Sequence, residues 1–265
     1  MYDCIQLVCD QGIATLTIDR PAELNAISEA AFGELKQALL GLHDNPDLRV
    51  VILKGNGKAF CAGGDIVFFA ELIRLPASQR PAAVRRYIGL AHEVVELLAG
   101  LKVPLLVVVQ GAAAGFGLSL CCLADLLVAS DNSRFVPAYI GLGATPDGGL
   151  SYNLPRLIGA GRAADLLLNN RGFDAEQAQQ WGLVSSRVAA GDLDAEVARL
   201  AGQLGAGPGV ATANTLMLLR SQRLDALRKV LDAELDSFAD CAQSDDFVEG
   251  VTAFLERRAP RFLSA

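Results

Sequence analysis

The sequence lacks features that mark several common classes of protein. It has no run of about eighteen apolar residues, so we expect no transmembrane helix. Its first ten residues, MYDCIQLVCD, carry no basic flank followed by an apolar stretch, which argues against a secretory signal and favours a cytoplasmic location. No internal repeat or low-complexity tract is present.

Metal-binding patterns and basic charge are also scarce. The chain has only two histidines, and its six cysteines show no CxxC spacing, so we expect no structural zinc site and reduced thiols. Acidic residues outnumber basic ones by 30 to 23, giving a net charge of −7, whereas nucleic-acid binders usually carry a basic surplus. We therefore expect no nucleic-acid partner and no membrane partner.

Apolar residues are abundant, because 52% of the 265 residues are hydrophobic and only 20% are charged. Strand patterns alternate with helical patterns over the first part of the chain, which predicts a layered α/β core. The expected strands are 5–8, 13–18, 50–54, 103–111 and 126–130, and the expected helices are 29–42, capped by Ser28, and 82–101. Segment 75–83 is expected to be a mobile loop over the site.

The pattern becomes helical after about residue 190, which divides the chain into a core, 1–190, and a helical region, 191–265. The helices expected in the second part are 191–205, 209–220, 223–241 and 246–258. Their apolar stripes need a partner surface, so we expect this region to pack on the core or on a neighbouring subunit.

Two glycine-containing turns and one acid point to chemistry. The turns are AFCAGGD at 59–65 and GAAAGFG at 111–117, and the acid is Asp147, between Pro146 and a glycine pair. Either turn alone is more often an ordinary tight turn, but together they can present two backbone N–H groups to a thioester oxygen. Asp147 would then act on the acyl group. The alternative interpretation is that Asp147 caps a helix starting near Gly148.

These motifs resemble those of the enoyl-CoA hydratase/isomerase (crotonase) family over nearly the whole chain. The matching segments are IDRPAELNAIS (18–28), AFCAGGDI (59–66), VPLLVVVQGAAAGFG (103–117), LADLLVASDNSRF (123–135), IGLGATPDGG (140–149), AEQAQQWGLVSSRV (175–188) and EGVTAFLERRAPRF (249–262). The resemblance implies an α/β crotonase (ClpP-like) spiral of ββα units with a helical C-terminal trimerisation region, assembled as a homotrimer or homohexamer. It also implies that a small-molecule acyl-CoA is the substrate and that no cofactor is needed.

The resemblance assigns the oxyanion hole to the backbone N–H groups of Gly64 and Phe116. Family members usually carry glycine at the second position, so the ring of Phe116 must point away from the thioester. Hydratases of the family use two glutamates where this chain has Ser119 and Tyr139, which makes hydration of an enoyl-CoA unexpected. Asp147 aligns with the catalytic aspartate of isomerases, including the phenylacetate-pathway isomerase, and with the nucleophile of 4-chlorobenzoyl-CoA dehalogenase.

Other residues come from the same alignment. His92 matches the catalytic histidine of the dehalogenase, although a half-buried helical histidine is the simpler interpretation. Phe254 and Arg257 would contact the CoA of an adjacent subunit, unless the last helix is merely solvated. The remaining residues expected to bind substrate or CoA are Leu24, Ala26, Ala62, Gly63, Asp65, Ile66 and Tyr139. Cys61, Phe68, Phe69 and Ala138 are expected beside Tyr139 in the acyl pocket.

The sequence therefore predicts an acyl-CoA enzyme, with isomerisation of an enoyl-CoA or an epoxyphenylacetyl-CoA-like substrate as the favoured reaction and Asp147 as acid and base. One alternative is a hydrolytic, dehalogenase-like enzyme with Asp147 as nucleophile and His92 as base. Another is a non-catalytic member that binds CoA esters, which would explain the missing glutamates but not the presence of Asp147.

Overall fold

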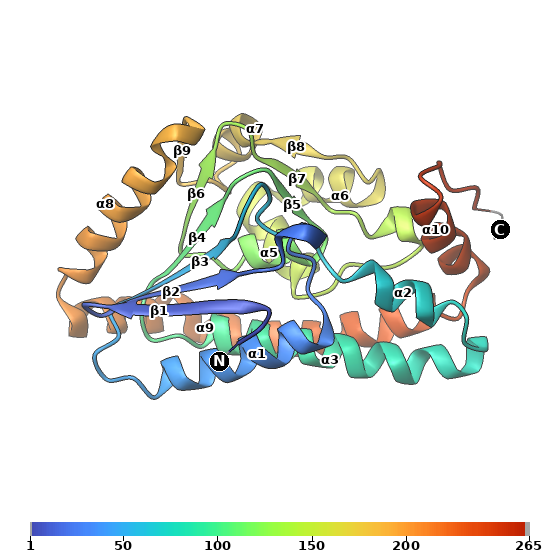
Figure 1. Cartoon of the computed structure of the whole chain (residues 1–265), viewed down its shortest axis with the longest axis horizontal. Coiled ribbons are helices and arrows are strands. Elements are labelled where there is room, and N and C mark those ends of the chain that lie inside the picture. Colours follow the sequence, from blue (N-terminus) through green and yellow to red (C-terminus); the bar gives the residue numbers. More distant parts are fainter. Residues whose placement is uncertain (1, 263–265) are drawn as a thin grey trace.

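The computed structural model describes residues 2–262, which fold around a six-stranded sheet flanked by helices (Figure 1). In spatial order the strands are β1 (Ile5–Asp10), β2 (Ile13–Ile18), β3 (Val50–Gly55), β4 (Leu105–Val109), β6 (Leu126–Ser130) and β9 (Ser186–Val188). β1 and β2 form the expected antiparallel hairpin, and every other neighbouring pair is parallel. The alternation of strand and helix signals thus predicted five of the six strands of this sheet, and β9 was not expected.

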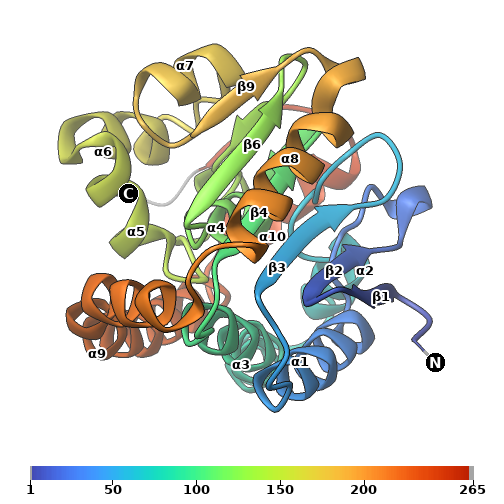
Figure 2. The same ribbon diagram turned by 90° about the vertical axis from the view of Figure 1, so that its left-hand side faces the viewer.

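The central strands are buried on both faces, which explains their almost continuous apolar sequence. On one face Val50, Ile52, Leu106 and Val108 pack with the helix α8 (Leu193–Gly205), which crosses the sheet in Figure 2. On the other face the alternate side chains of β3 and β4 join the main core, beneath which three long helices run. These helices are α1 (Glu29–His43), α3 (Arg80–Ala99) and α9 (Gly209–Cys241).

A second, three-stranded sheet lies beside the first. Its strands are β5 (Ala112–Ala114), β7 (Arg134–Val136) and β8 (Phe173–Asp174). The chain leaves β4 for β5 through Gly111, where φ is +59° and a Cβ would come within 2.0 Å of the carbonyl oxygen of Lys58. Only glycine fits this corner, and the expected strand 103–111 therefore ends two residues earlier.

Shorter elements complete the fold. The helices are α2 (Ile66–Leu72), α4 (Phe116–Cys121), α5 (Leu150–Ile158), α6 (Ala160–Leu168), α7 (Ala175–Gln180) and α10 (Asp245–Leu255). The 3₁₀ turns are η1 (Pro21–Glu23), η2 (Ala77–Gln79), η3 (Ile140–Leu142) and η4 (Ala190–Asp192). Ser28 caps α1 as expected, its side chain accepting from the N–H of Ala31 at 3.2 Å. No helix within residues 2–262 is both long and apolar enough to cross a membrane.

Two expectations were wrong. Segment 75–83 is not a loop throughout, because η2 and the first turn of α3 occupy it and Arg80 is buried, donating to the carbonyl oxygens of Leu75 and Ala242 at 3.0 and 3.3 Å. The helices expected at 209–220 and 223–241 are one helix, α9. No proline or glycine interrupts residues 210–241, and an ion pair of Arg220 with Asp125 ties the middle of α9 to the core.

The C-terminal helices pack on the rest of the chain. Besides α8 on the sheet, α9 lies along α3 and α5, and α10 contacts α2 and η3. Residue 190 therefore marks a change from strands to helices within one packed body. A part for residues 191–265 in trimer formation stays a prediction.

Candidate active site

A cavity of about 330 Å³ lies between α2, α3, α4, η3 and α10. Most of its walls are apolar, and the expected site residues among them are Ala62, Gly63, Gly64, Ile66, Phe116, Tyr139, Asp147 and Phe254. A larger cavity of about 550 Å³, at the ends of α1 and α3 and the start of α9, contains none of the expected site residues. The smaller cavity is therefore the candidate active site.

The Gly64 amide, expected as the first oxyanion donor, takes its direction from the peptide plane that it shares with Gly63. Ile27 and Gly64 form an isolated parallel bridge in which the N–H of Ile27 donates to the carbonyl oxygen of Gly63 at 2.8 Å. Because the peptide between Gly63 and Gly64 is trans, the N–H of Gly64 points the opposite way. Gly63 has a φ of +101° and a Cβ there would come within 2.9 Å of the carbonyl oxygen of Ala114, so the turn requires glycine.

The second donor begins a helix. Phe116 is the first residue of α4, where amide groups have no partner within the helix. Among the hydrogen bonds of residues 2–262, neither the Phe116 nor the Gly64 amide has an acceptor. The Phe116 ring packs edge-on against Phe32, with ring centroids 5.2 Å apart, and is 3% exposed. The amide is thus left free while the ring forms part of the cavity wall.

Asp147 is the acid of the cavity and is 7% exposed. The Tyr139 hydroxyl donates to its Oδ1 atom at 2.5 Å, and the Ser119 hydroxyl donates to its carbonyl oxygen at 2.9 Å. Ser119 Oγ also lies 3.1 Å from the Tyr139 hydroxyl. Burial raises the pKa of Asp147 to about 7, partly offset by the hydrogen bond from Tyr139, and the charge of Glu234 raises it further. A carboxyl with this pKa exchanges a proton readily near neutral pH.

Asp147 does not cap the following helix. Gly149 holds the N-cap position of α5 and offers no side chain, while the Glu234 carboxylate accepts from the N–H groups of Gly149 and Ser151 at 2.7 and 3.0 Å. Glu234 comes from α9 and is 5% exposed. The alternative interpretation of Asp147 as a helix cap is therefore wrong, and its second oxygen faces no protein donor among the described hydrogen bonds.

Glu234 was not expected from the sequence. It lies 85 residues from the amide that it caps, and a single glutamate within a helical pattern usually faces solvent. Burial raises the pKa of Glu234, while its hydrogen bonds from Ser151 and Gly149 lower it. Local spacing carries no signal for such a contact between distant segments.

His92 is not brought to the cavity. It is 7% exposed on α3, its Nε2 atom has no hydrogen-bond partner, and burial lowers its pKa to about 4. Tyr87, five residues earlier, does line the cavity, and residues five apart lie on different sides of a helix. The structure thus places His92 in the packed interior of the helix layer.

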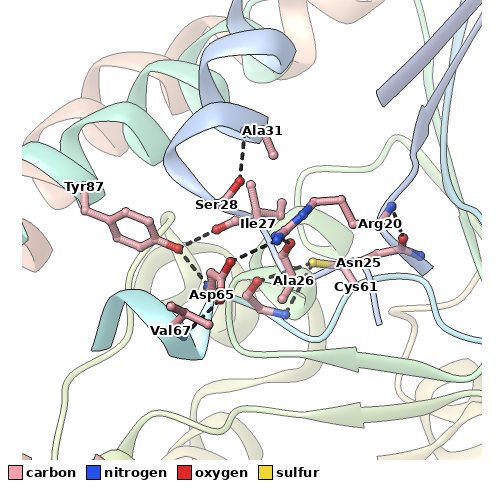
Figure 3. A network of polar contacts seen from close by, with 11 residues as sticks. Arg20, Asn25, Ala26, Ile27, Ser28, Ala31, Cys61, Asp65, Val67 and Tyr87 are labelled. Carbon is pink, nitrogen blue, oxygen red and sulfur yellow. Dashed lines mark hydrogen bonds and ion pairs between the residues drawn. The ribbon is translucent and has the colours of Figure 1, made fainter. Parts of the chain in front are cut away.

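Three of the other expected residues lie outside the cavity wall. Ala26 and Asp65 belong to a polar network behind the cavity wall (Figure 3), and Leu24 bonds to the backbone of the wall at Ala62. The Leu24 carbonyl accepts from the Ala62 N–H at 3.0 Å, the Ala26 carbonyl accepts from Arg20, and Asp65 pairs with Arg20 at 3.1 Å. Their contacts fix the backbone around Gly63 and Gly64.

Of the residues expected in the acyl pocket, some line the cavity and others lie behind its wall. Phe69 and Ala138 line the cavity together with Tyr139, whereas Phe68 stacks on Tyr87 and does not line it. Cys61 is fully buried behind the wall, where its sulfur accepts from the Gly63 N–H at 3.4 Å and burial raises its pKa to about 12.

At the C-terminal end, Phe254 lines the cavity of its own chain, and the neighbouring basic lining residue is Arg258. Arg257 is exposed and does not line the cavity, since its φ of +55° turns the chain just after α10. Arg258 is held by Glu249 at 2.5 Å. The resemblance had implied Arg257, and the structure places the next residue, Arg258, in the cavity wall instead, while the contact with a neighbouring subunit's CoA stays a prediction.

A buried acid and two backbone amides without acceptors among the described hydrogen bonds line one apolar cavity, an arrangement suited to binding a carbonyl oxygen and moving a proton near it. The family model of enoyl-CoA hydratase/isomerase matches residues 9–265. The chain belongs to this family.

Several named relatives show how similar the chain is to different members. A crotonyl-CoA hydratase of Syntrophomonas wolfei is 32% identical over 99% of both chains, and a 1,2-epoxyphenylacetyl-CoA isomerase of Escherichia coli K12 is 32% identical over 99% of both. A 4-chlorobenzoyl coenzyme A dehalogenase of an Arthrobacter species is 34% identical over 74% of this chain and 70% of that protein.

A solved enoyl-CoA hydratase of Mycobacterium avium subsp. paratuberculosis has a TM-score of 0.87 and 31% identity, covering 100% of both chains. The fold is therefore the crotonase fold, as the sequence predicted. The relatives carry different reactions at similar identity, so the chain is an acyl-CoA enzyme whose reaction must be inferred from its own site.

Proposed function

We propose that this enzyme moves a double bond or a comparable unsaturation within an acyl-CoA, acting as an isomerase with Asp147 as the single acid and base. The observation that carries the proposal is the buried Asp147, which lines the cavity together with Gly64 and Phe116. One oxygen of this carboxyl is held by Tyr139, and the other is available to a substrate. CoA enters as part of the substrate, and no cofactor is required by this chemistry.

The proposed reaction begins with the thioester oxygen bound by the N–H groups of Gly64 and Phe116. Asp147 takes a proton from carbon 2 of a 3-enoyl thioester, and the released electron pair moves into the thioester to give a dienolate. The two N–H groups stabilise the oxyanion, an effect worth about 3–4 kcal/mol for each donor in comparable sites. Asp147 then returns the same proton to carbon 4, which leaves the double bond between carbons 2 and 3.

Hydration is disfavoured by what the site contains. Adding water to an enoyl thioester calls for groups that activate water as well as groups that donate a proton. The two positions where hydratases of the family carry glutamates hold Ser119 and Tyr139, and both of these hydroxyls are committed to each other and to Asp147.

Asp147→Asn tests the proposal. The variant should lose isomerisation by at least about a thousandfold, because it keeps the shape but removes the group that moves the proton. It should still bind acyl-CoA within a fewfold of the parent affinity, measured by calorimetry. A screen of acyl-CoA thioesters followed by mass spectrometry distinguishes the reactions. Isomerisation leaves the mass of the thioester unchanged, while hydration raises it by about 18 Da. Unchanged turnover of the Asn variant would refute the assignment of Asp147.

The hydrolytic alternative predicts a different result for His92→Gln. If Asp147 attacked carbon and His92 activated water, this variant would accumulate a covalent ester, because general-base help is typically worth about 10²–10⁴-fold. We expect instead less than about a tenfold loss of turnover and an unmodified protein, since His92 does not line the cavity. Intact-protein mass spectrometry after mixing with substrate measures this. A stable adduct on His92→Gln would favour the dehalogenase-like reaction.

A further inference from the structure

We propose that Tyr87 is a positioning residue for the oxyanion hole: its hydroxyl joins the backbone just after Gly64 to the facing strand at Ile27, and so keeps the Gly64 N–H facing the thioester oxygen. The inference rests on the proposed function, because it concerns the donor that stabilises the enolate. It assigns to Tyr87 a role that neither the glycine motif nor the acid reveals.

The hydroxyl of Tyr87 makes two hydrogen bonds to opposite strands of the bridge that contains Gly64 (Figure 3). It accepts from the N–H of Asp65 at 2.9 Å and donates to the carbonyl oxygen of Ile27 at 2.5 Å. The Asp65 nitrogen also lies 3.3 Å from the Ile27 carbonyl oxygen, a longer contact than the usual backbone hydrogen bond. The Tyr87 hydroxyl therefore strengthens the link between Ile27 and Asp65, the residue that follows Gly64.

The peptide before Gly64 is fixed independently, because the Ile27 N–H donates to the Gly63 carbonyl oxygen at 2.8 Å. The peptide planes before and after Gly64 are thus both restrained, although glycine itself has wide rotational freedom. The Asp65 carboxylate adds an anchor by pairing with Arg20 at 3.1 Å and accepting from the Val67 N–H at 3.0 Å. Figure 3 shows these groups converging on one short segment of backbone.

The ring of Tyr87 holds the hydroxyl in place. It stacks on Phe68 with centroids 4.0 Å apart and planes 11° from parallel, and it meets Phe32 edge-on at 5.4 Å. A Cβ added to Gly64 would lie 3.2 Å from the Tyr87 hydroxyl oxygen, so the hydroxyl lies close to the position that a side chain would take at residue 64. Tyr87 is 2% exposed, and burial raises the pKa of its phenol well above the ordinary value, which keeps the donated proton in place.

Tyr87→Phe tests the inference by removing the hydroxyl and leaving the ring. In the Asp147→Asn background, a thioester with a ¹³C-labelled carbonyl can be bound without turnover and examined by infrared difference spectroscopy. The parent should lower the carbonyl stretch relative to the free thioester, because the N–H donors polarise the bond. Tyr87→Phe in that background should return the stretch part of the way toward the free value, which a purely structural role would not do.

Kinetics of the single Tyr87→Phe variant give a second measure. Complete loss of one oxyanion donor costs about 10²–10³-fold in kcat. A displaced donor should cost less, about 10- to 100-fold, with KM changed by less than about threefold. Tyr152→Phe is the matched control, since Tyr152 packs under Arg156 and does not line the cavity. It should leave both kcat and the carbonyl stretch unchanged.

An unshifted stretch and a kcat within about twofold of the parent in folded Tyr87→Phe would overturn the inference while leaving Asp147 intact. If Tyr87→Phe does not fold, 4-aminophenylalanine at position 87 keeps a donor for the Ile27 carbonyl but is a poor acceptor for the Asp65 N–H. We expect an intermediate stretch for it, and a stretch equal to that of the parent would again overturn the inference. If Asp147→Asn with Tyr87 intact showed no lowered stretch, the proposed function and this inference would both fail.

Discussion

At the scale of single residues, the hydrogen bond from Tyr139 to Asp147 decides how the acid works. It stabilises the charged form of Asp147, whereas burial and the charge of Glu234 stabilise the neutral form, and burial is the strongest of these effects. The resulting pKa of about 7 allows one carboxyl group to take a proton and give it back without a second acid.

The pH dependence of activity should report this balance. As a base, Asp147 must be deprotonated, so kcat/KM should fall as the pH drops through about 7. Tyr139→Phe removes a bond that favours the carboxylate, which raises the pKa of Asp147 further and moves the acidic limb of the profile to higher pH. The profile of kcat/KM from about pH 5 to 9 measures the displacement.

Tyr152→Phe serves as a control for Tyr139→Phe, because Tyr152 packs under Arg156 and is not among the hydrogen-bond partners described for Asp147. Its acidic limb should stay close to that of the parent. A limb that moved to lower pH in Tyr139→Phe would contradict the role given to the phenol.

The sequence predicted residues in short motifs and missed partners from distant segments. Gly64, Phe116 and Asp147 were correctly expected near one another, since each follows a recognisable turn. The contacts of Tyr87 and Glu234 with backbone 22 and 85 residues away could not be predicted, because nothing in local spacing distinguishes a buried phenol or carboxylate from an exposed one.

At the scale of secondary structure, α10 forms one wall of the cavity, and its Gly250 allows close packing against η3. A Cβ on Gly250 would lie 2.4 Å from the carbonyl carbon of Leu142 in η3, so the helix and the 3₁₀ turn touch through backbone. Phe254 of α10 and Leu142 both line the cavity. The position of this helix therefore sets the width of the site on that side.

Gly250→Ala should displace α10 from η3 and loosen that wall. We expect KM for the acyl-CoA to rise by about tenfold with a smaller change in kcat, and a loss of stability of about 1–3 kcal/mol from overpacking. Steady-state kinetics and denaturant unfolding measure both effects. Gly202→Ala in α8 is the control, since its Cβ meets no atom within 4 Å, and it should leave KM unchanged. Equal kinetics for the two variants would contradict the role of α10.

Element boundaries were harder to predict than element types. The hairpin, the buried strand of β4 and the cap of α1 were confirmed because their side chains alternate or cap locally. The turn before α3 was mistaken for a loop, since its prolines and small residues resemble a linker. Its order comes from Arg80, whose partners include the Ala242 carbonyl, 162 residues away.

At the scale of the whole molecule, α9 carries large apolar side chains on its surface. Met217, Leu218 and Leu219 are 59%, 74% and 71% exposed, and Val210 at the start of the same helix is 79% exposed. Clusters of this kind often mark contacts between proteins. They are a candidate contact surface for a second copy of the chain, and the homotrimer or homohexamer stays a prediction.

We expect light scattering at micromolar concentration to give a multiple of the 27.9 kDa chain mass. The double substitution Leu218→Lys and Leu219→Lys places two charges in the apolar surface and should reduce the measured mass toward that of one chain. Val8→Lys, at a side chain 59% exposed on β1, is the control and should leave the assembly unchanged. A parent mass of 27.9 kDa would contradict the expected assembly.

The burial of Cys61 has a consequence for chemical self-damage. A 2-enoyl thioester is a Michael acceptor, and a thiolate next to it would add to carbon 3 and alkylate the enzyme. The thiolate is the reactive form of cysteine, and burial raises the pKa of Cys61 to about 12, so almost all of it remains thiol near neutral pH. The protein thus keeps a sulfur atom beside the proposed oxyanion hole, bonded to the Gly63 amide, in a form that reacts only slowly with the electrophilic product we propose.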